Sequence, residues 1–259
     1  MLGLGNSICD ASYAGGKYSN FSGSFDGTAD FVLLSKTAAL APAAAVSLSF
    51  WMKPNAWDMP SGADQDTMLG CKRTGGWEVY LANSHPGDAT TLNFLIYVTD
   101  TGSGSSGAIT ATLNEATTEA LTGWHHVVAT YDGTTAKLYI DGGTTGVTNA
   151  TSASGTTINY HSTSSRPLVL GADVAGATTA QNFYHGLLDE VAVFNSALSS
   201  GNVTSIYNSG APNDISGMSN LVGYWRFEEG TGNAVADDSS NSNNGGLGNA
   251  WTWSEDTPE

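Results

Sequence analysis

The sequence predicts an all-β fold of two packed antiparallel sheets, and three observations support this. Short apolar runs recur along the chain and are separated by turn signals. Glycine occurs 32 times, and serine and threonine are abundant, which favours strands and tight turns over helices. Asp-Gly, whose glycine accepts a positive φ, occurs at 26–27, 132–133 and 141–142. Many short strands joined by turns are typical of a barrel or a sandwich, and we expect a sandwich.

The expected strands lie in ten segments. In chain order they are GSFDGTADFVLL, VSLSFWMKP, DTMLGCKR, GWEVYLAN, LNFLIYVT, AITATL, GWHHVVATY, AKLYIDG, PLVLGAD and HGLLDEVAVF. Both alternating faces of residues 124–131 carry bulky side chains, which predicts a central strand. Adjacent strand residues point to opposite faces, so His125 and His126 should diverge. We therefore expect a structural role for this pair, with one histidine buried and hydrogen-bonded, rather than a shared metal.

One short helix is expected near 199–209. Ser199 or Ser200 can cap its start, and Gly210 can end it. The residues that would form its buried face are Val203, Ile206 and Tyr207.

The chain divides into three parts by composition. Residues 1–20 are rich in glycine and serine and are expected to form an N-terminal arm. Residues 21–210 hold the predicted strands and form the main domain. Residues 211–259 resume strand character at 221–227 and should complete the same sandwich, although pairing with a neighbouring subunit is the alternative.

The charge balance excludes several classes of partner. Lys and Arg total 8 against 24 Asp and Glu, for a net charge of -16, and no basic stripe is present to attract nucleic acid. No apolar run reaches transmembrane length, and the start of the chain lacks the basic region of a secretory signal. Cys9 and Cys71 can form one disulfide or remain two thiols, and the second alternative is favoured.

Four segments in a fixed order resemble the laminin-G-like domains of the concanavalin-A-like lectin/glucanase superfamily. They are GSFDGTADFV, VSLSFWMKP, GWHHVVATYDGTTAKLYIDG and GLLDEVAVFNSALSSGNVTSIYN, and the resemblance covers about 21–210. It implies a jelly-roll sandwich with one convex and one concave sheet. LVGYWRFEEGTGNAVADDSSNSNNGG also looks like a family element, but one that normally opens such a domain and here closes the chain.

Enzymes of this superfamily imply a catalytic trio that the sequence lacks. A glucanase would place two glutamates around an aspartate on one strand, because retaining hydrolysis needs its carboxyls about 5 Å apart. Glu115 and Glu119 come nearest to the required spacing, but no aspartate lies between them. Asp189 and Glu190 are adjacent, so a regular strand would point them to opposite faces. We therefore expect a protein that is not an enzyme.

Calcium is the cofactor for which the sequence offers candidates. Hard cations take six to eight oxygen ligands, and the loop ADDSSNSNNGG is rich in them, although a solvated Asx-rich loop explains it equally well. The resemblance adds a second candidate, in which the Asp26 of FDG pairs with the Asp189 of LLDEV; turn capping and a surface carboxylate are the alternatives. The loop residues proposed as ligands are Asp237, Asp238, Asn241 and Asn243.

Exposed aromatic rings are the expected handles for a glycan, because a sugar stacks its C–H face on a ring. Trp57, Trp77 and Tyr97 are the candidates, and Trp57 is the strongest because it lies in a polar segment. Burial in the core is the alternative for each ring. Trp51 and Trp124 are expected in the core.

These expectations combine into a non-catalytic recognition or structural module. We expect a bacteriophage virion protein, assembled in the host cytoplasm as a decoration or fibre-associated part, oligomeric and touching a glycan or other virion or cell-surface proteins. A soluble lectin or adhesin, extracellular or on the cell surface, is the alternative, and a glucanase ranks below both. Neither nucleic-acid binding nor membrane insertion is expected.

Overall fold

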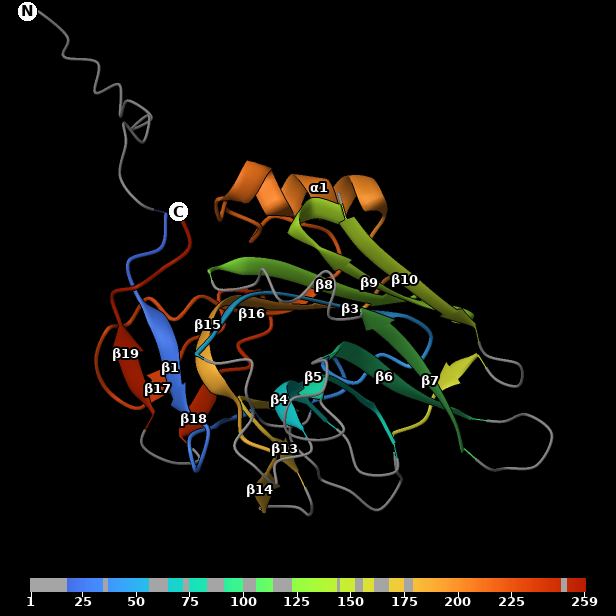
Figure 1. The fold of residues 1–259 in the computed structure, drawn as a ribbon, viewed down its shortest axis with the longest axis horizontal. Coiled ribbons are helices and arrows are strands. Elements are labelled where there is room, and N and C mark those ends of the chain that lie inside the picture. The colour runs from blue at the N-terminus through green and yellow to red at the C-terminus, as the bar shows by residue number, and fades with distance from the viewer. Residues whose placement is uncertain are drawn as a thin grey trace, which may run out of the picture.

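Two antiparallel sheets pack face to face in the computed structural model (Figure 1). The structure describes residues 18–34, 37–55, 65–71, 75–82, 91–99, 106–113, 123–143, 145–151, 156–160, 168–174, 179–247 and 251–259. The predicted fold class, a two-sheet sandwich with one short helix, is confirmed.

Sheet A is the upper layer in Figure 1 and has the order β10-β9-β8-β3-β15-β1-β19, with β16 also paired to β15. Strand β8 lies between β9 and β3, so the prediction that 124–131 forms a central strand is confirmed. The bounds are β1 (Ser22–Asp26), β3 (Val46–Pro54), β8 (His125–Tyr131), β9 (Thr135–Ile140), β10 (Thr145–Thr151), β15 (His185–Phe194), β16 (Leu221–Trp225) and β19 (Thr252–Ser254).

Sheet B is the lower layer and has the order β11-β6-β5-β4-β12-β2-β18-β17, with β7 also paired to β6. A separate two-stranded sheet joins β13 (Asp173–Val174) to β14 (Ala180–Gln181). The bounds in sheet B are β2 (Val32–Leu34), β4 (Asp66–Gly70), β5 (Trp77–Ala82), β6 (Thr91–Thr99), β7 (Ser106–Leu113), β11 (Thr157–Ile158), β12 (Leu168–Leu170), β17 (Ala234–Val235) and β18 (Gly245–Leu247).

The core fills the space between the two sheets. Inward side chains alternate along the strands, as in β6, where Phe94, Ile96 and Val98 are all fully buried. They meet the inward face of sheet A, which contributes Phe50 and Val127. Burying this apolar surface is the main force that holds the sheets together.

The glycines of the Asp-Gly turns confirm the predicted turn chemistry. Gly27, Gly133 and Gly142 have φ values of 73°, 96° and 77°. A side chain in this left-handed region would be strained, so glycine is the residue that allows these turns.

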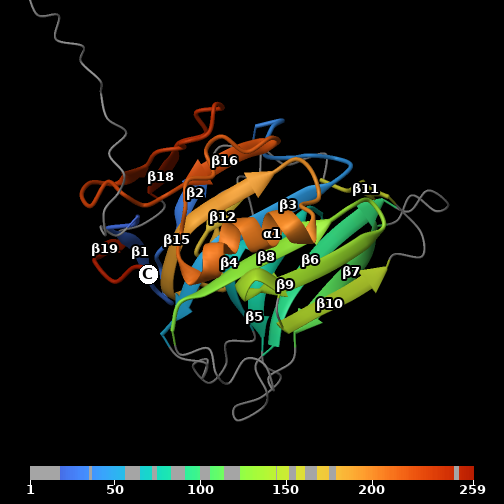
Figure 2. The same ribbon diagram turned by 90° about the horizontal axis from the view of Figure 1, so that it is seen from above.

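Helix α1 (Ser200–Tyr207) covers the outer face of sheet A (Figure 2). Ser199 is its N-cap, and Val203 and Ile206 are buried, as the sequence predicts. The helix ends at Asn208, which takes the left-handed conformation with φ 48°, whereas Gly210 was expected to end it. A 3₁₀ turn (Asn208–Gly210) then follows, and another (Asp141–Gly143) follows β9. None of the helices that the structure describes is long and apolar enough to cross a membrane.

The histidine pair has the structural role that the sequence predicts. His126 is 1% exposed, its Nε2 lies 2.9 Å from the Ser49 hydroxyl, and burial lowers its pKa to about 3. Nδ1 of His125 lies 2.7 Å from Oδ2 of Asp141. The other carboxylate oxygen of Asp141 accepts a hydrogen bond from the backbone N–H of His126. The two rings therefore have different partners.

The C-terminal segment contributes strands to both sheets. Strand β16 pairs with β15, β18 with β2, and β19 with β1, all within the same chain. The last residues of the chain lie beside the first described ones (Figure 1). The Thr257 hydroxyl donates a hydrogen bond to the Ser19 carbonyl at 3.0 Å. Within the described chain, these strands cover edges that β1, β2 and β15 would otherwise leave open.

Candidate functional site

Strand β15 has a seam on one of its edges. Strand β1 pairs with its first half and β16 with its second half, so Asp189 and Glu190 lie at the junction. Glu190 has a φ of 49°, and the register with β3 shifts between Asp189 and Ala192. This β-bulge means that the strand does not alternate regularly here. The expectation that Asp189 and Glu190 point to opposite faces of a regular strand is therefore wrong.

A group of polar side chains fills this junction, and we call it the seam cluster. The Ser19 hydroxyl lies 2.6 Å from Asp189 Oδ2 and 2.9 Å from Glu228 Oε1. Arg226 Nε donates to Glu190 Oε1 at 3.2 Å, and the Tyr224 hydroxyl donates to the other Glu190 oxygen. The members of the cluster are Ser19, Asp189, Glu190, Tyr224, Arg226 and Glu228.

Burial dominates the protonation of the seam cluster. It raises the pKa of Glu190 to about 7, against the opposing effect of the Arg226 charge. Burial and the neighbouring Glu190 raise the pKa of Asp189 well above its ordinary value. The cavity beside Glu190 holds about 10 Å³, which is room for roughly one water. Asp189 and Glu190 are thus buried, and the cavity beside Glu190 has no space for a substrate.

The proposed calcium pair of Asp26 and Asp189 is not formed. In the ladder between β1 and β15, Asp26 faces His185 and Gly23 faces Leu188. Asp26 is therefore offset from Asp189 by four residues, about 13 Å along the strand axis. Asp26 instead accepts the backbone N–H groups of Thr28 and Ala29 at 2.8 and 2.9 Å, the turn-capping alternative.

The Asx-rich loop is held by its own hydrogen bonds. The carboxylate of Asp237 accepts backbone N–H groups from Tyr224, Ser239 and Asn243 at 2.7 to 2.8 Å. The Asn243 amide donates to the Val222 carbonyl at 2.8 Å. These contacts anchor the loop to β16.

The remaining loop candidates are not gathered around one point. Asp238 is exposed and lies 4.0 Å from the Arg226 guanidinium, and Asn241 bonds to Ser239 within the loop. Among the described residues, no three His, Cys, Asp or Glu side chains are placed to hold a metal ion. Calcium binding stays a prediction.

A second acid-bearing region is open, and we call it the acidic cleft. It lies at the end of the sandwich where the β1–β2 turn, the start of β4 and the start of β15 meet, and its volume is about 420 Å³. Known ligand pockets occupy roughly 300–1,000 Å³, so its size suits a small ligand. Its described lining consists of Asp26, Gly27, Thr28, Gln65, Asp66, Asn182, Phe183 and His185.

Asp26 forms one wall of the cleft and is exposed. Although burial raises its pKa, hydrogen bonds from Thr28, Ala29 and Asp30 lower it to about 2. Gly27 lets the turn pass close to His185, where an added Cβ would lie 2.8 Å from the histidine Cβ. The Asp26 carboxylate is therefore fixed in place and ionised at neutral pH.

Asp66, at the start of β4, also lines the cleft and is 6% exposed. Burial raises its pKa to about 6, while His185 acts in the opposite direction. The neighbouring Gln65 accepts from the Asn182 amide at 3.4 Å through its Oε1. Its Nε2 is buried and has no hydrogen-bond partner among the described residues.

The floor of the cleft comes from the segment that leads into β15. Asn182 has a φ of 52°, and its carbonyl accepts the Thr67 N–H at 2.9 Å. The half-buried ring of Phe183 lies 6.2 Å from that of Phe31, centroid to centroid. His185 Nε2 lies 2.9 Å from the amide nitrogen of Asn55. These contacts place an aromatic surface beside two carboxylates and two amides.

The predicted sugar-facing rings do not come together. Trp77 is 0% exposed, and its indole donates to the Tyr160 hydroxyl at 3.0 Å, so it belongs to the core and offers no face to a sugar. Tyr97 is partly exposed on β6 and is not among the described residues of the cleft. Trp57 and Cys9 lie outside the described residues. Trp124 is only half-buried and donates to Asp256 at 2.8 Å, against the expectation of a core position.

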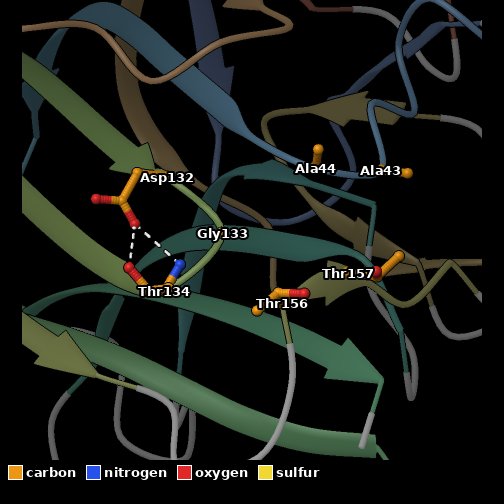
Figure 3. Close-up of a pocket in the computed structure, with 7 residues that line it drawn as sticks. All are labelled: Ala43, Ala44, Asp132, Gly133, Thr134, Thr156 and Thr157. Carbon is orange, nitrogen blue, oxygen red and sulfur yellow. Dashed lines mark hydrogen bonds between the residues drawn. The ribbon is translucent and has the colours of Figure 1, made fainter. Parts of the chain in front are cut away.

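A shallow hollow lies elsewhere, beside the β8–β9 turn (Figure 3). It holds about 300 Å³, and Ala43, Ala44, Thr156 and Thr157 line it together with the turn. The Asp132 carboxylate points toward the β8–β9 turn, where it accepts hydrogen bonds from the Thr134 N–H at 2.9 Å and from the Thr134 hydroxyl at 2.8 Å. Without an aromatic ring in its described lining, the hollow is the weaker candidate.

Sequence reasoning missed most of the cleft. Asp66, Gln65, Asn182 and His185 were not singled out, because each stands at a strand boundary in a segment with no recognisable motif. The available signal was polar residues at the ends of strands, where side chains of several loops converge. That signal identifies many positions and does not say which loops meet.

The fold and the site define a lectin-type β-sandwich with an open polar cleft at one end. The family described as the concanavalin A-like lectin/glucanases superfamily, in its laminin G form, matches residues 26–204. The chain belongs to this family, which confirms the resemblance seen in the sequence. No curated protein matches the chain by sequence.

Two solved structures illustrate the similarity. A putative carbohydrate binding protein from Bacteroides ovatus is 15% identical, with a TM-score of 0.62, over 93% of this chain and 61% of that chain. Full-length tailspike protein 2 from an Escherichia coli O157:H7 bacteriophage is 15% identical, with a TM-score of 0.51, over 84% of this chain and 31% of that chain. At this identity the likeness shows the fold alone.

Proposed function

We propose that this protein is a non-catalytic carbohydrate-recognition module and that the acidic cleft holds the sugar. The carrying observation is the lining of the cleft, where the Asp26 and Asp66 carboxylates and the Gln65 and Asn182 amides surround an open volume beside the Phe183 ring. Sugar hydroxyls donate to carboxylates and exchange hydrogen bonds with amides, and the C–H face of a sugar stacks on an aromatic ring.

The similarity to lectin-type proteins supports this proposal. The family name includes lectins, and one structure of the same fold is titled a putative carbohydrate binding protein. The family name also includes glucanases, so hydrolysis is the competing activity. A hydrolase needs an acid and a second carboxylate placed across a scissile bond. The seam cluster holds the carboxylates of Asp189 and Glu190, but both are buried and the cavity beside Glu190 is too small for a sugar, which supports binding over hydrolysis.

The test is a glycan-binding screen on the full chain and on three variants. We expect the wild type to bind at least one neutral or amine-bearing glycan, Asp66→Asn to weaken binding about tenfold because it loses a charged acceptor, and Phe183→Ala to weaken it further by removing the stacking surface. Asp132→Asn is the matched control, because it makes the same chemical change in the shallow hollow and should bind like the wild type.

Two results would contradict the proposal. One is the absence of binding to any glycan in a broad panel. The other is release of reducing sugar from a laminarin-like polysaccharide at a rate that Asp66→Asn or Glu190→Gln abolishes.

A place in a bacteriophage particle is the finer proposal for this module. Its support is the likeness in fold to a phage tailspike protein. Mass spectrometry of purified virions tests it, and detection only in a secreted or cell-surface fraction would favour the lectin or adhesin alternative.

A further inference from the structure

The charges of the acidic cleft differ from those of a site for an acidic glycan. Two carboxylates, Asp26 and Asp66, line it, and none of its described lining residues is a lysine or arginine. Asp26 is held as an anion by its hydrogen bonds to the turn. Bringing like charges together is unfavourable, so a uronate, sulfate or sialate group is disfavoured here.

His185 also lines the cleft, and its charge lowers the pKa of the Asp66 carboxyl against the effect of burial. The Asn55 amide nitrogen, which only donates, lies 2.9 Å from Nε2 of His185. This contact engages Nε2 of His185 with Asn55. The cleft presents carboxylate acceptors on the side of Asp26 and Asp66.

A buried amide donor lies at the same place. Gln65 holds its Oε1 toward Asn182, which leaves its Nε2 buried and unpaired among the described residues. An unpaired buried donor is unfavourable, so an acceptor oxygen placed against it is favoured. A ligand that fits must combine a strong, positively charged donor with a neighbouring acceptor oxygen.

We infer that the acidic cleft selects a sugar with a free protonated amine over its N-acetylated, neutral or acidic counterparts. The ammonium group donates to the Asp26 and Asp66 carboxylates, a hydroxyl oxygen of the same sugar accepts from Gln65, and the ring packs on Phe183. The amide of an acetylated sugar has no charge to offer the carboxylates. This inference rests on the proposed function and specifies the substrate class of the same site.

The experiment is a calorimetric titration of the full chain with three oligosaccharides of equal length, in buffer containing a chelator at pH 7.5. The probes are oligomers of glucosamine, of N-acetylglucosamine and of galacturonic acid. The variants are Asp66→Asn and Asp26→Asn, each of which keeps an amide oxygen at the same position, with Asp132→Asn as the charge-matched control. A thermal melt of each variant verifies that it folds.

We expect the glucosamine oligomer to bind about tenfold tighter than the acetylated one and the galacturonate oligomer not to bind. Each cleft variant should reduce this preference, and Asp132→Asn should retain it. Raising ionic strength should weaken glucosamine binding more than acetylated-sugar binding, because part of the attraction is between exposed charges.

The contrary outcomes separate this inference from the proposed function. If the acetylated or galacturonate oligomer binds as tightly as the glucosamine oligomer and Asp66→Asn weakens that binding, the amine selectivity is wrong while the sugar site stands. If binding appears only when calcium replaces the chelator, recognition is through a metal and the amine inference is wrong. If no oligomer binds, the amine selectivity is wrong and the broad glycan panel decides the proposed function. If binding is the same in all variants, the acidic cleft is not the sugar site and both proposals fail.

Discussion

The seam cluster and the acidic cleft use the same kind of side chain for opposite purposes. In the seam cluster, Glu190 is 5% exposed, and Arg226 and Tyr224 satisfy its carboxylate. In the cleft, Asp26 and Asp66 line an open volume of about 420 Å³ with no lysine or arginine in the described lining. The difference shows that acids alone do not mark a site: what distinguishes the cleft is that its carboxylates border open space.

The largest effect is expected from breaking the seam cluster. Arg226→Met removes the cation that faces buried Glu190 and should lower the free energy of unfolding by about 3 kcal/mol, because a buried charge then lacks its partner. Urea denaturation measures this. Lys53→Met is the control, since the Lys53–Asp256 pair is partly exposed and should contribute about 0.5 kcal/mol or less. Equal losses in the two variants would mean that the seam cluster does not hold the fold.

The pH dependence of stability should also originate in the seam cluster. The folded-state pKa of Glu190 is raised from 4.5 to about 7, so the folded protein binds more protons than the unfolded chain between these values. Stability is therefore highest at low pH within this window and falls as pH rises toward 7. Glu190→Gln should remove roughly 2–3 kcal/mol of that fall. The free energy of unfolding, measured with urea from pH 5 to pH 8, gives this dependence on pH. If Glu190→Gln shows the same dependence on pH as the wild type, the prediction is wrong.

The smallest change in stability is expected in the cleft. Burial raises the pKa of Asp66 to about 6, and His185 opposes this effect; Tyr184 is the other titratable group in electrostatic contact. Since the ionised form is disfavoured in the folded state, stability is lost as pH rises through about 6. Asp66→Asn at pH 8 should thus be as stable as the wild type or roughly 1 kcal/mol more stable, while it binds sugar less well. A destabilisation beyond 1 kcal/mol would show that Asp66 is structural, like Glu190.

Local chemistry made much of the fold predictable. The Asp-Gly turns, the central strand at 124–131, the capping Ser199 and the buried face of α1 all depend on residues close in sequence. The errors came where distant segments meet. Trp77 was a candidate for an exposed, sugar-facing ring, but it lies in the core. Asp26 and Asp189 were a candidate calcium pair, but the register of β1 and β15 separates them.

The helix end illustrates the same limit at short range. Gly210 was the expected terminator because glycine accepts a positive φ at least cost. Asn208 takes that conformation instead, two residues earlier, since asparagine tolerates it.

The sequence by itself determined the strand periodicity, the turns, the acidic balance and the family, because each depends on residue type and local spacing. Only the tertiary structure decided which acids are sealed and which are open. That choice depends on strand register and on three loops, at 26–28, 65–66 and 182–185, meeting at one end of the sandwich. Register is set by the packing of the whole sheet, so no short stretch of the chain encodes it.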